Sequence, residues 1–175
     1  MKRTTALLTA ALMLLCCTLA FSACETPKEA VIPEGYQVYS NGDISFAYPE
    51  EWTKTDGSTV ILMNESGVGN NITVVYEAKN SFYSTMDVED FNTSMKPSLE
   101  AVGMTVTNVV VTQTKNDLDV SITKISYNAS MSGVSMSQTI FITTAGSRTY
   151  SVTVTETTSA SELVKNVFET LSVIK

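Results

Sequence analysis

Acidic side chains lie close together in groups at several points along this chain. Three such groups occur: Glu50 and Glu51; Asp87, Glu89 and Asp90; and Asp117 and Asp119. A hydrolase of the glycosidase type needs two carboxyl groups flanking a cleft, one of them with a raised pKa. These acids instead fall at predicted turns and at a predicted helix start, where solvated or capping roles suffice. A calcium site at Asp117 and Asp119 lacks the six to eight oxygen ligands and the spacing of a known loop.

Cysteine and histidine, the other common catalytic and metal-binding residues, are scarce. The chain holds Cys16, Cys17 and Cys24 and no histidine. Without histidine, the Ser-His and Cys-His nucleophile arrangements cannot be assembled, and the commonest metal ligand is missing. No phosphate-binding loop, dinucleotide-binding glycine pattern or Cys/His metal spacing occurs either. We therefore expect a protein that is not an enzyme and that holds no cofactor or metal.

The first 24 residues have the layout of a secretory signal. Lys2 and Arg3 precede an apolar stretch over 6–21, and Ser22-Ala23-Cys24 follow it. A positive start, an apolar core and small residues before a cleavage point define such a signal. The segment ending at Cys24 also resembles the bacterial lipobox, in which the cysteine receives a lipid and becomes the new N-terminus. The alternative is an ordinary signal peptide cut after Ala23.

The lipobox resemblance implies a protein held on the membrane by a diacylglycerol on Cys24, because two or more acyl chains anchor stably. We expect a signal peptide over 1–23, a lipidated cysteine with a short polar tether over 24–33, and one globular domain over 34–175. The expected location is the extracytoplasmic face of the cell membrane, on the outer leaflet of a Gram-positive cell. After removal of Lys2 and Arg3, the chain has nine basic and eighteen acidic side chains. A net charge of −9 repels phosphate backbones, so nucleic acid is excluded as a partner.

Most of the domain carries strand patterns. Residues 36–39 and the alternating Ile44, Phe46 and Tyr48 flank an Asn41-Gly42 turn, which is typical of a hairpin. Runs over 59–63 and 72–76 predict a second pair. Four β-type runs follow at 105–112, 118–127, 134–143 and 149–155, and their short connections indicate an antiparallel meander. In the last run, the alternation places Tyr150, Val152 and Val154 inside and Thr149, Ser151, Thr153 and Thr155 in solvent.

Two segments have helical periodicity. Over 87–102, apolar residues recur three or four positions apart at Val88, Phe91, Met95, Leu99 and Val102. Pro97 should kink or split this helix, and Gly103 stands where a helix-ending glycine belongs. Over 159–171, Leu163, Val164, Val167, Phe168 and Leu171 form an apolar stripe. The fold class is therefore α+β: a twisted antiparallel sheet of about six or seven strands flanked by two helices.

The segment Ile44-Ser45-Phe46-Ala47-Tyr48-Pro49-Glu50-Glu51-Trp52 resembles the F-x-Y-P-x-x-W opening of the PsbP-like superfamily, which includes PsbP- and DcrB-type domains. The resemblance covers residues 36–175, with an opening hairpin, a middle helix, a meander and a final helix in order. It implies an α/β/α sandwich around an antiparallel sheet. It also implies a non-catalytic assembly or binding role. Phe46, Tyr48, Pro49 and Trp52 are interpreted as a core-and-turn motif, with a ligand site as the alternative.

These observations predict a non-catalytic binding or accessory module that engages another envelope protein. A carrier or sensor of a small apolar ligand or a cation is the alternative, and an acid-based hydrolase ranks last. Five methionines bear on the carrier alternative, since they are either packing filler or the lining of an adaptable apolar groove: Met86, Met95, Met104, Met131 and Met136.

Overall fold

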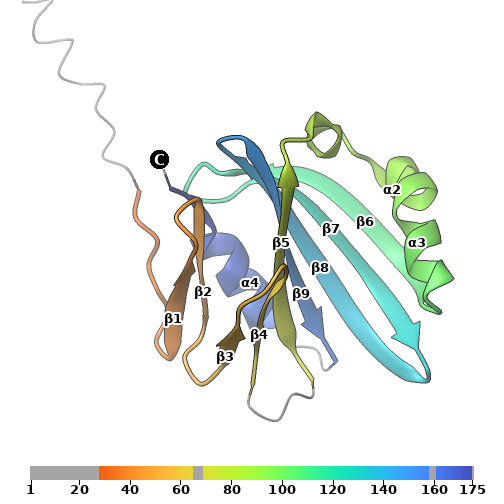
Figure 1. Cartoon of the computed structure of the whole chain (residues 1–175), viewed down its shortest axis with the longest axis horizontal. Helices are drawn as coiled ribbons and strands as arrows, with labels where there is room; N and C mark the ends of the chain where they lie inside the picture. Colours follow the sequence, from red (N-terminus) through yellow and green to blue (C-terminus); the bar gives the residue numbers. More distant parts are fainter. Residues whose placement is uncertain (1–27, 65–68, 158–160, 175) are drawn as a thin grey trace, which may run out of the picture.

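The computed structural model describes residues 28–64, 69–157 and 161–174 (Figure 1). The elements in chain order are β1 (Tyr36–Ser40), β2 (Ile44–Pro49), β3 (Thr53–Thr55), β4 (Val60–Met63), β5 (Asn71–Ala78), the short 3₁₀ helix η2 (Ser81–Ser84), α2 (Val88–Ser94), α3 (Lys96–Ala101), β6 (Thr105–Lys115), β7 (Ser121–Met131), β8 (Val134–Ala145), β9 (Arg148–Glu156), α4 (Ser161–Thr170) and β10 (Ser172–Val173).

The strands of this described part form two antiparallel sheets. The large sheet has seven strands in the order β3-β4-β5-β9-β8-β7-β6, and the small sheet has three in the order β1-β2-β10. The predicted α+β class with a seven-stranded sheet and flanking helices is confirmed. The opening hairpin, however, does not join the large sheet, because β2 pairs instead with β10 from the far end of the chain.

The opening hairpin forms where the Asn41-Gly42 pair predicts it. The Asn41 side-chain oxygen accepts hydrogen bonds from the backbone N–H groups of Asp43 and Ile44, both at 3.0 Å. Gly42 has a φ of 90°, a left-handed conformation that favours glycine. The local chemistry of the turn therefore fixes the register of β1 against β2.

The middle helix is split, as Pro97 predicts. α2 ends at Ser94, and α3 begins at Lys96 with Pro97 in its first turn. Proline lacks an N–H and is tolerated in a first turn but not inside a helix. The predicted apolar stripe is correct at its centre, where Phe91 is buried, but wrong at its end, because Val102 is 66% exposed.

The meander β6-β7-β8-β9 is confirmed as four consecutive antiparallel strands. The expectation that Thr149 and Thr155 face solvent is wrong, since they are only 2% and 8% exposed. Both hydroxyls have hydrogen-bond partners. Thr149 Oγ1 accepts from the Asn80 backbone N–H at 2.9 Å, and Thr155 Oγ1 lies 3.0 Å from Gln138 Nε2. A threonine at an alternating position can thus be buried on the second face of a two-sided sheet.

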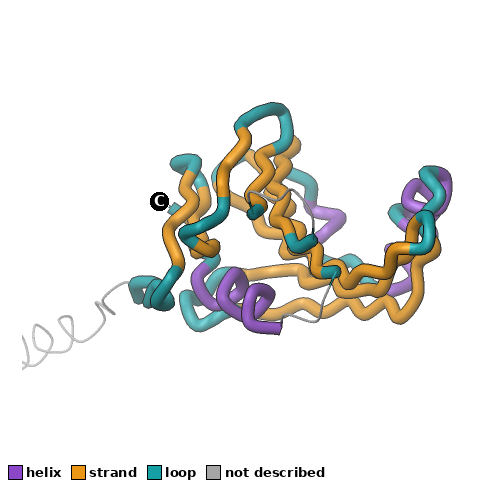
Figure 2. Tube along the Cα trace, turned by 90° about the horizontal axis from the view of Figure 1, so that it is seen from below, coloured by secondary structure: helices purple, strands orange, loops and turns teal. Residues whose placement is uncertain are grey.

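Each face of the large sheet carries its own apolar core. The first core lies between the sheet, α4 and the small sheet, and includes Phe46, Phe141 and Val167. The second core lies under α2 and α3, and includes Phe91, Ile125 and Ile140. Figure 2 shows the sheet curving, so that the end formed by β6 rises with α2 and α3. Helices therefore cover both faces, but over different parts of the sheet.

Candidate functional site

The F-x-Y-P-x-x-W residues lie in the first core and at its edge. Phe46, Tyr48 and Trp52 are buried, and Pro49 is half-buried. The Trp52 backbone N–H donates to the Pro49 carbonyl oxygen at 3.1 Å, which closes the turn after β2. The side chains of Phe46, Tyr48 and Trp52 belong to this core, and neither they nor Pro49 line either of the two pockets described below.

Cys24 lies outside the described residues, as do Cys16 and Cys17. The lipid attachment at Cys24 therefore stays a prediction from the sequence.

The acidic groups singled out above lie on the surface. Glu50, Glu51 and Asp87 are exposed. Asp87 and Asp90 cap α2 reciprocally: Asp87 Oδ1 accepts from the Asp90 N–H at 2.9 Å, and Asp90 Oδ2 accepts from the Asp87 N–H at 3.1 Å. The capping role proposed for these acids at the helix start is therefore seen in the structure.

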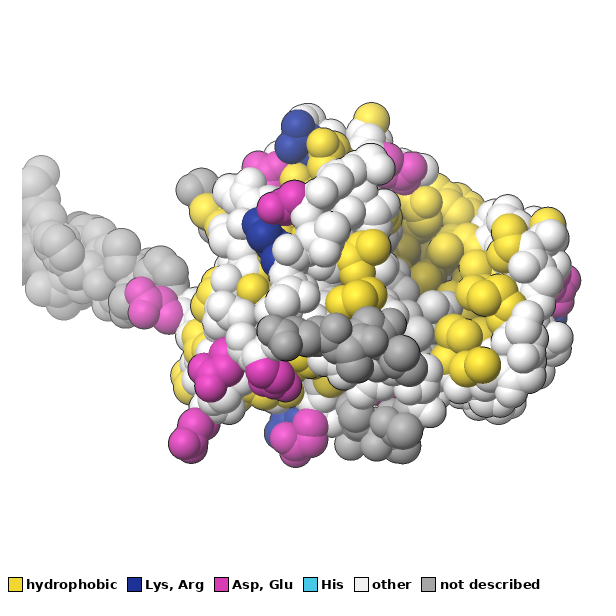
Figure 3. Space-filling model, turned by 60° about the horizontal axis from the view of Figure 1, so that its bottom comes forward, with side chains coloured by type: hydrophobic (Ala, Val, Ile, Leu, Met, Phe, Trp, Pro, Cys, Tyr) yellow, Lys and Arg dark blue, Asp and Glu magenta, His cyan; other side chains and the backbone are white. Residues whose placement is uncertain are grey.

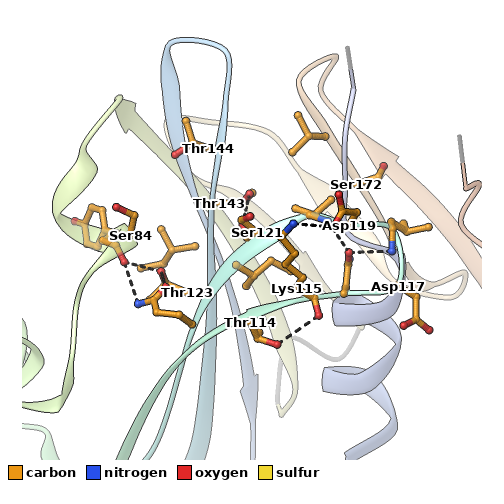
Figure 4. A pocket seen from close by; sticks show the side chains of 18 of the residues that line it. Ser84, Thr114, Lys115, Asp117, Asp119, Ser121, Thr123, Thr143, Thr144 and Ser172 are labelled. Atoms are coloured by element: carbon orange, nitrogen blue, oxygen red, sulfur yellow. Dashed lines mark hydrogen bonds and ion pairs between the residues drawn. The ribbon is translucent and has the colours of Figure 1, made fainter. Parts of the chain in front are cut away.

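A broad pocket lies at the upper end of the molecule as drawn in Figure 1, between η2, the turn joining β6 to β7, and β10. We call it the upper pocket. It has a volume of about 1590 Å³, and Asp117, Asp119 and Lys115 belong to its lining. Figure 4 shows hydroxyl side chains from β6, β7, β8 and η2 around it, labelled Ser84, Thr114, Ser121, Thr123, Thr143 and Thr144.

Many polar groups of the upper pocket already have partners within the protein. Lys115 Nζ lies 2.8 Å from Asp119 Oδ1, and Thr143 Oγ1 donates to the Ser121 carbonyl oxygen at 3.0 Å. Gln113 Nε2 donates to the Met86 carbonyl oxygen at 3.0 Å. Since the chain has no histidine, these hydroxyls have no imidazole base. The arrangement suits surface contact and hydrogen bonding better than activation of a nucleophile.

Asn116 organises the turn that forms one wall of this pocket. It is 6% exposed, and its side-chain nitrogen donates to the carbonyl oxygens of Phe168 and Leu171 at 2.8 and 2.6 Å. Its side-chain oxygen accepts from the N–H groups of Leu118 and Val120, both at 3.1 Å. Asn116 therefore joins the pocket wall to the end of α4.

A second ionisable cluster joins the two sheets. The Tyr150 hydroxyl donates to Asp43 Oδ2, and Arg148 Nη1 lies 3.3 Å from the same oxygen. The Arg148 guanidinium stacks 4.6 Å from the centre of the Tyr76 ring. Burial raises the pKa of the Tyr150 hydroxyl, with a further contribution from the hydrogen bond to Asp43. Because these groups bind one another through a hydrogen bond and an ion pair, we interpret the cluster as a structural link between the opening hairpin and β9.

A smaller pocket lies at the opposite end of the large sheet, and we call it the lower pocket. Its volume is about 440 Å³, and its lining includes Asn128, Ser137 and Glu156. Glu156 is 7% exposed, and its Oε1 atom is buried without a hydrogen-bond partner in the described part of the chain. Burial raises the pKa of this carboxyl group above its ordinary value.

Sequence reasoning did not single out Glu156, although a signal was present. Tyr150, Val152 and Val154 alternate on the buried side of β9, and Glu156 is the next residue of that series. Strand alternation therefore places its side chain on the first face of the sheet. A lone acid that continues a buried apolar series marks an unusual carboxyl group.

Four of the five methionines gather around the second core. Met86 is buried within it, and Met95, Met104 and Met136 pack against it. Met131 is exposed at the end of β7. Figure 3 shows hydrophobic side chains around a hollow beside the end of the molecule that carries α2 and α3. Most of these methionines therefore pack within or against the second core.

In the described ranges, no three acidic, histidine or cysteine side chains come together where they could hold a metal ion. Nor is any described helix long and apolar enough to cross a membrane.

No model of a known protein family matches the chain, and no curated protein matches its sequence. Solved structures do resemble it. A crystal structure of a protein from Bacteroides thetaiotaomicron VPI-5482 matches with a TM-score of 0.51 and 12% identity, over 86% of this chain and 50% of that one. This chain thus spans about half the length of the Bacteroides protein. At 12% identity the likeness concerns the fold alone.

Two further structures match with lower scores. LpqN of Mycobacterium tuberculosis, described as involved in cell envelope biogenesis, has a TM-score of 0.44 and 12% identity, over 80% of this chain and 91% of LpqN. PA94 of Pseudomonas aeruginosa, a protein of unknown function described as a putative regulator, has a TM-score of 0.38 and 13% identity, over 69% of this chain and 82% of PA94.

Proposed function

We propose that this protein is a non-catalytic accessory module of the cell envelope, tethered by a lipid on Cys24, that engages another envelope protein through the upper pocket. The observation that carries the proposal is the position of Lys28, which lines that pocket. Four residues of extended chain reach about 14 Å at most, so a lipid on Cys24 keeps the mouth of the upper pocket close to the membrane surface.

The chemistry of the upper pocket supports a protein partner. Its internal hydroxyl and amide groups are largely engaged, whereas Asp117 at its rim is exposed. Protein interfaces commonly combine partly apolar surface with a polar, solvated rim. Leu118 and Tyr83, both half-buried in the lining, supply the apolar part.

Membership of the PsbP-like superfamily is part of the same proposal. The F-x-Y-P-x-x-W segment and the order of elements support it: hairpin, middle helix, meander and final helix follow one another along the chain. An accessory role without catalysis accords with the lack of histidine in the sequence.

The test is photocrosslinking in the native cells. A photoreactive amino acid replaces Asp117 at the rim of the upper pocket, and Ser132, exposed in the turn between β7 and β8, serves as the matched control position. We expect one discrete adduct from position 117, none from position 132, and loss of the adduct in Cys24→Ala protein. Equal adducts from both positions, or no adduct from position 117, would contradict the proposal.

A carrier of a small apolar ligand is the second candidate, and the methionines around the second core favour it. Methionine side chains adapt to irregular apolar shapes. Native mass spectrometry of protein isolated from its own cells distinguishes the two: a carrier retains a bound apolar molecule, whereas an accessory module has the mass of the lipidated chain alone.

A further inference from the structure

The lower pocket contains a buried carboxyl group, and no basic side chain of the described residues lines that pocket. Glu156 ends β9 on the first face of the sheet, and its buried Oε1 atom has no hydrogen-bond partner among the residues that the structure describes. No lysine or arginine belongs to the pocket lining. Buried carboxylates are normally paired or hydrogen-bonded, because their desolvation is otherwise uncompensated.

Neutral polar side chains continue from Glu156 across the sheet. In the strand registers Glu156 stands opposite Ser137, Ser137 opposite Asn128, and Asn128 opposite Thr107. Directly paired residues have Cβ atoms about 5 Å apart and share one face of a sheet. A second row, Thr105, Ser130 and Ser135, runs beside the first. The two rows and Glu156 line the same pocket.

The hydrogen-bonding groups of the first row are only partly paired with one another. Ser137 Oγ donates to Asn128 Oδ1 at 3.2 Å. Such a surface offers hydroxyl and amide groups, each able to donate and accept, next to a single acceptor of negative charge. The complementary ligand therefore carries one positively charged donor and several hydroxyl groups.

A bare metal ion fits these features poorly. Calcium takes six to eight oxygen ligands, often with more than one carboxylate, and only one carboxylate lines this pocket. The volume of about 440 Å³ falls within the range of small-molecule sites, roughly 300–1,000 Å³. The space and the polar row both indicate an organic cation of several heavy atoms.

We propose that the lower pocket binds a small hydroxyl-rich molecule bearing a primary ammonium group. The ammonium donates hydrogen bonds to Glu156, and the hydroxyl groups lie along Ser137, Asn128 and Thr107. This site is separate from the upper pocket, so it does not depend on the proposed protein partner. The raised pKa of Glu156 accords with a carboxyl group that lacks its counter-ion.

The test uses the full chain in detergent, with D-glucosamine as the probe and calorimetric titration as the measurement. N-acetyl-D-glucosamine is the matched neutral control, because it keeps the sugar hydroxyls and replaces the ammonium with an amide. We expect D-glucosamine to bind at least about tenfold more tightly than the neutral sugar, since a charge-assisted hydrogen bond is lost in the latter.

Variants locate the binding. Glu156→Gln should weaken D-glucosamine binding by about tenfold or more and leave binding of the neutral sugar unchanged. Ser137→Ala should weaken both sugars, while Asp117→Asn in the upper pocket should weaken neither. Circular dichroism melts check that each variant is folded, and Ser137→Ala, at an exposed position, provides a second test if Glu156→Gln does not fold.

Equal affinities for the two sugars, absence of D-glucosamine binding, or full binding by Glu156→Gln would overturn the proposal. Binding of calcium chloride that is lost in Glu156→Gln, without any D-glucosamine binding, would likewise overturn it in favour of a metal site.

Discussion

Two buried polar side chains, Asn116 and Glu156, differ in how fully their polar atoms are hydrogen-bonded. Asn116 makes four hydrogen bonds to backbone groups, two as donor and two as acceptor. Glu156 has a buried oxygen without any partner in the described chain. Since an unmade buried hydrogen bond costs more than a made one gains, these two positions should respond in opposite directions to substitution.

Glu156→Gln should stabilise the protein at neutral pH. The pKa of Glu156 is raised in the folded state from an ordinary value of 4.5 by desolvation. Below that value the carboxyl is protonated in both states. As pH rises from there through the higher folded pKa, the unfolded state loses its proton first, so folding stability falls. Glutamine does not titrate, so the Glu156→Gln variant does not undergo this pH-dependent loss of folding stability. We expect a gain on the order of 1 kcal/mol near pH 7.5 that shrinks towards pH 4.

Urea denaturation of wild type and Glu156→Gln at several pH values between 4 and 8 measures this difference. Glu51→Gln is the control, since Glu51 is an exposed acid on the surface. A Glu156→Gln protein less stable than wild type at pH 7.5 would mean that favourable interactions hold the carboxylate.

Asn116→Ala should destabilise the protein by about 3 kcal/mol, because it leaves buried backbone groups at the end of α4 and in the turn between β6 and β7 without partners. Asn116→Asp should be at least as harmful near neutral pH, since a carboxylate cannot donate to the Phe168 and Leu171 carbonyls. Thermal and urea denaturation measure both, with Asn92→Ala on the exposed side of α2 as control. Wild-type stability in Asn116→Ala would show that this network contributes little.

At the scale of elements, the parts that the sequence predicts are those whose signals are local. The Asn41-Gly42 hairpin, the break at Pro97 and the apolar stripe of α4 each depend on neighbouring residues. The pairing of β2 with β10 joins Ser45 to Ser172, which are 127 positions apart, and no local pattern encodes it. The alternation of β9 wrongly predicts that Thr149 and Thr155 face solvent. Their hydroxyls are buried because hydrogen-bond partners from distant parts of the chain lie on that face of the strand.

The same contrast applies to the candidate sites. Acidic residues close in sequence, such as Glu50 and Glu51, lie exposed on the surface. The lower pocket instead combines residues from four strands, one to three per strand, whose proximity arises only from the register of the sheet. Only the alternation of β9 into Glu156 could have indicated it from the sequence.

The α2–α3 unit depends on its reciprocal cap. The Asp87 side chain accepts a hydrogen bond from the Asp90 backbone N–H, and the Asp90 side chain accepts one from the Asp87 backbone N–H. Asp87→Ala should therefore cost about 1 kcal/mol of unfolding free energy, while Asp87→Asn, which retains an accepting oxygen, should cost only a few tenths. Urea denaturation measures both, and Glu89→Ala in the same first turn is the control. Equal losses from the alanine and asparagine variants would contradict a capping role.

At the scale of the whole molecule, the two pockets lie at opposite ends of the large sheet (Figure 1). Lys28 lines the upper pocket, so a lipid on Cys24 would orient the domain with that pocket towards the membrane and the lower pocket away from it. Such an orientation would leave the lower pocket open to small solutes, while the upper pocket would meet proteins at the membrane surface.

This orientation can be measured on lipidated protein reconstituted into vesicles that contain a headgroup-linked fluorescence quencher. Single labels attached through Asp117→Cys and Ser132→Cys report the upper and lower ends, because both positions are exposed, and a lipid on Cys24 would leave that thiol unavailable to the label. Because a lipid on Cys24 would lie within about 14 Å of Lys28 at most, we expect stronger quenching at position 117 than at position 132. Cleavage of the tether by protease should abolish quenching at both. Equal quenching at the two positions, or stronger quenching at position 132, would mean that the upper pocket does not face the membrane, and the proposed partner would then have to be sought away from the bilayer surface.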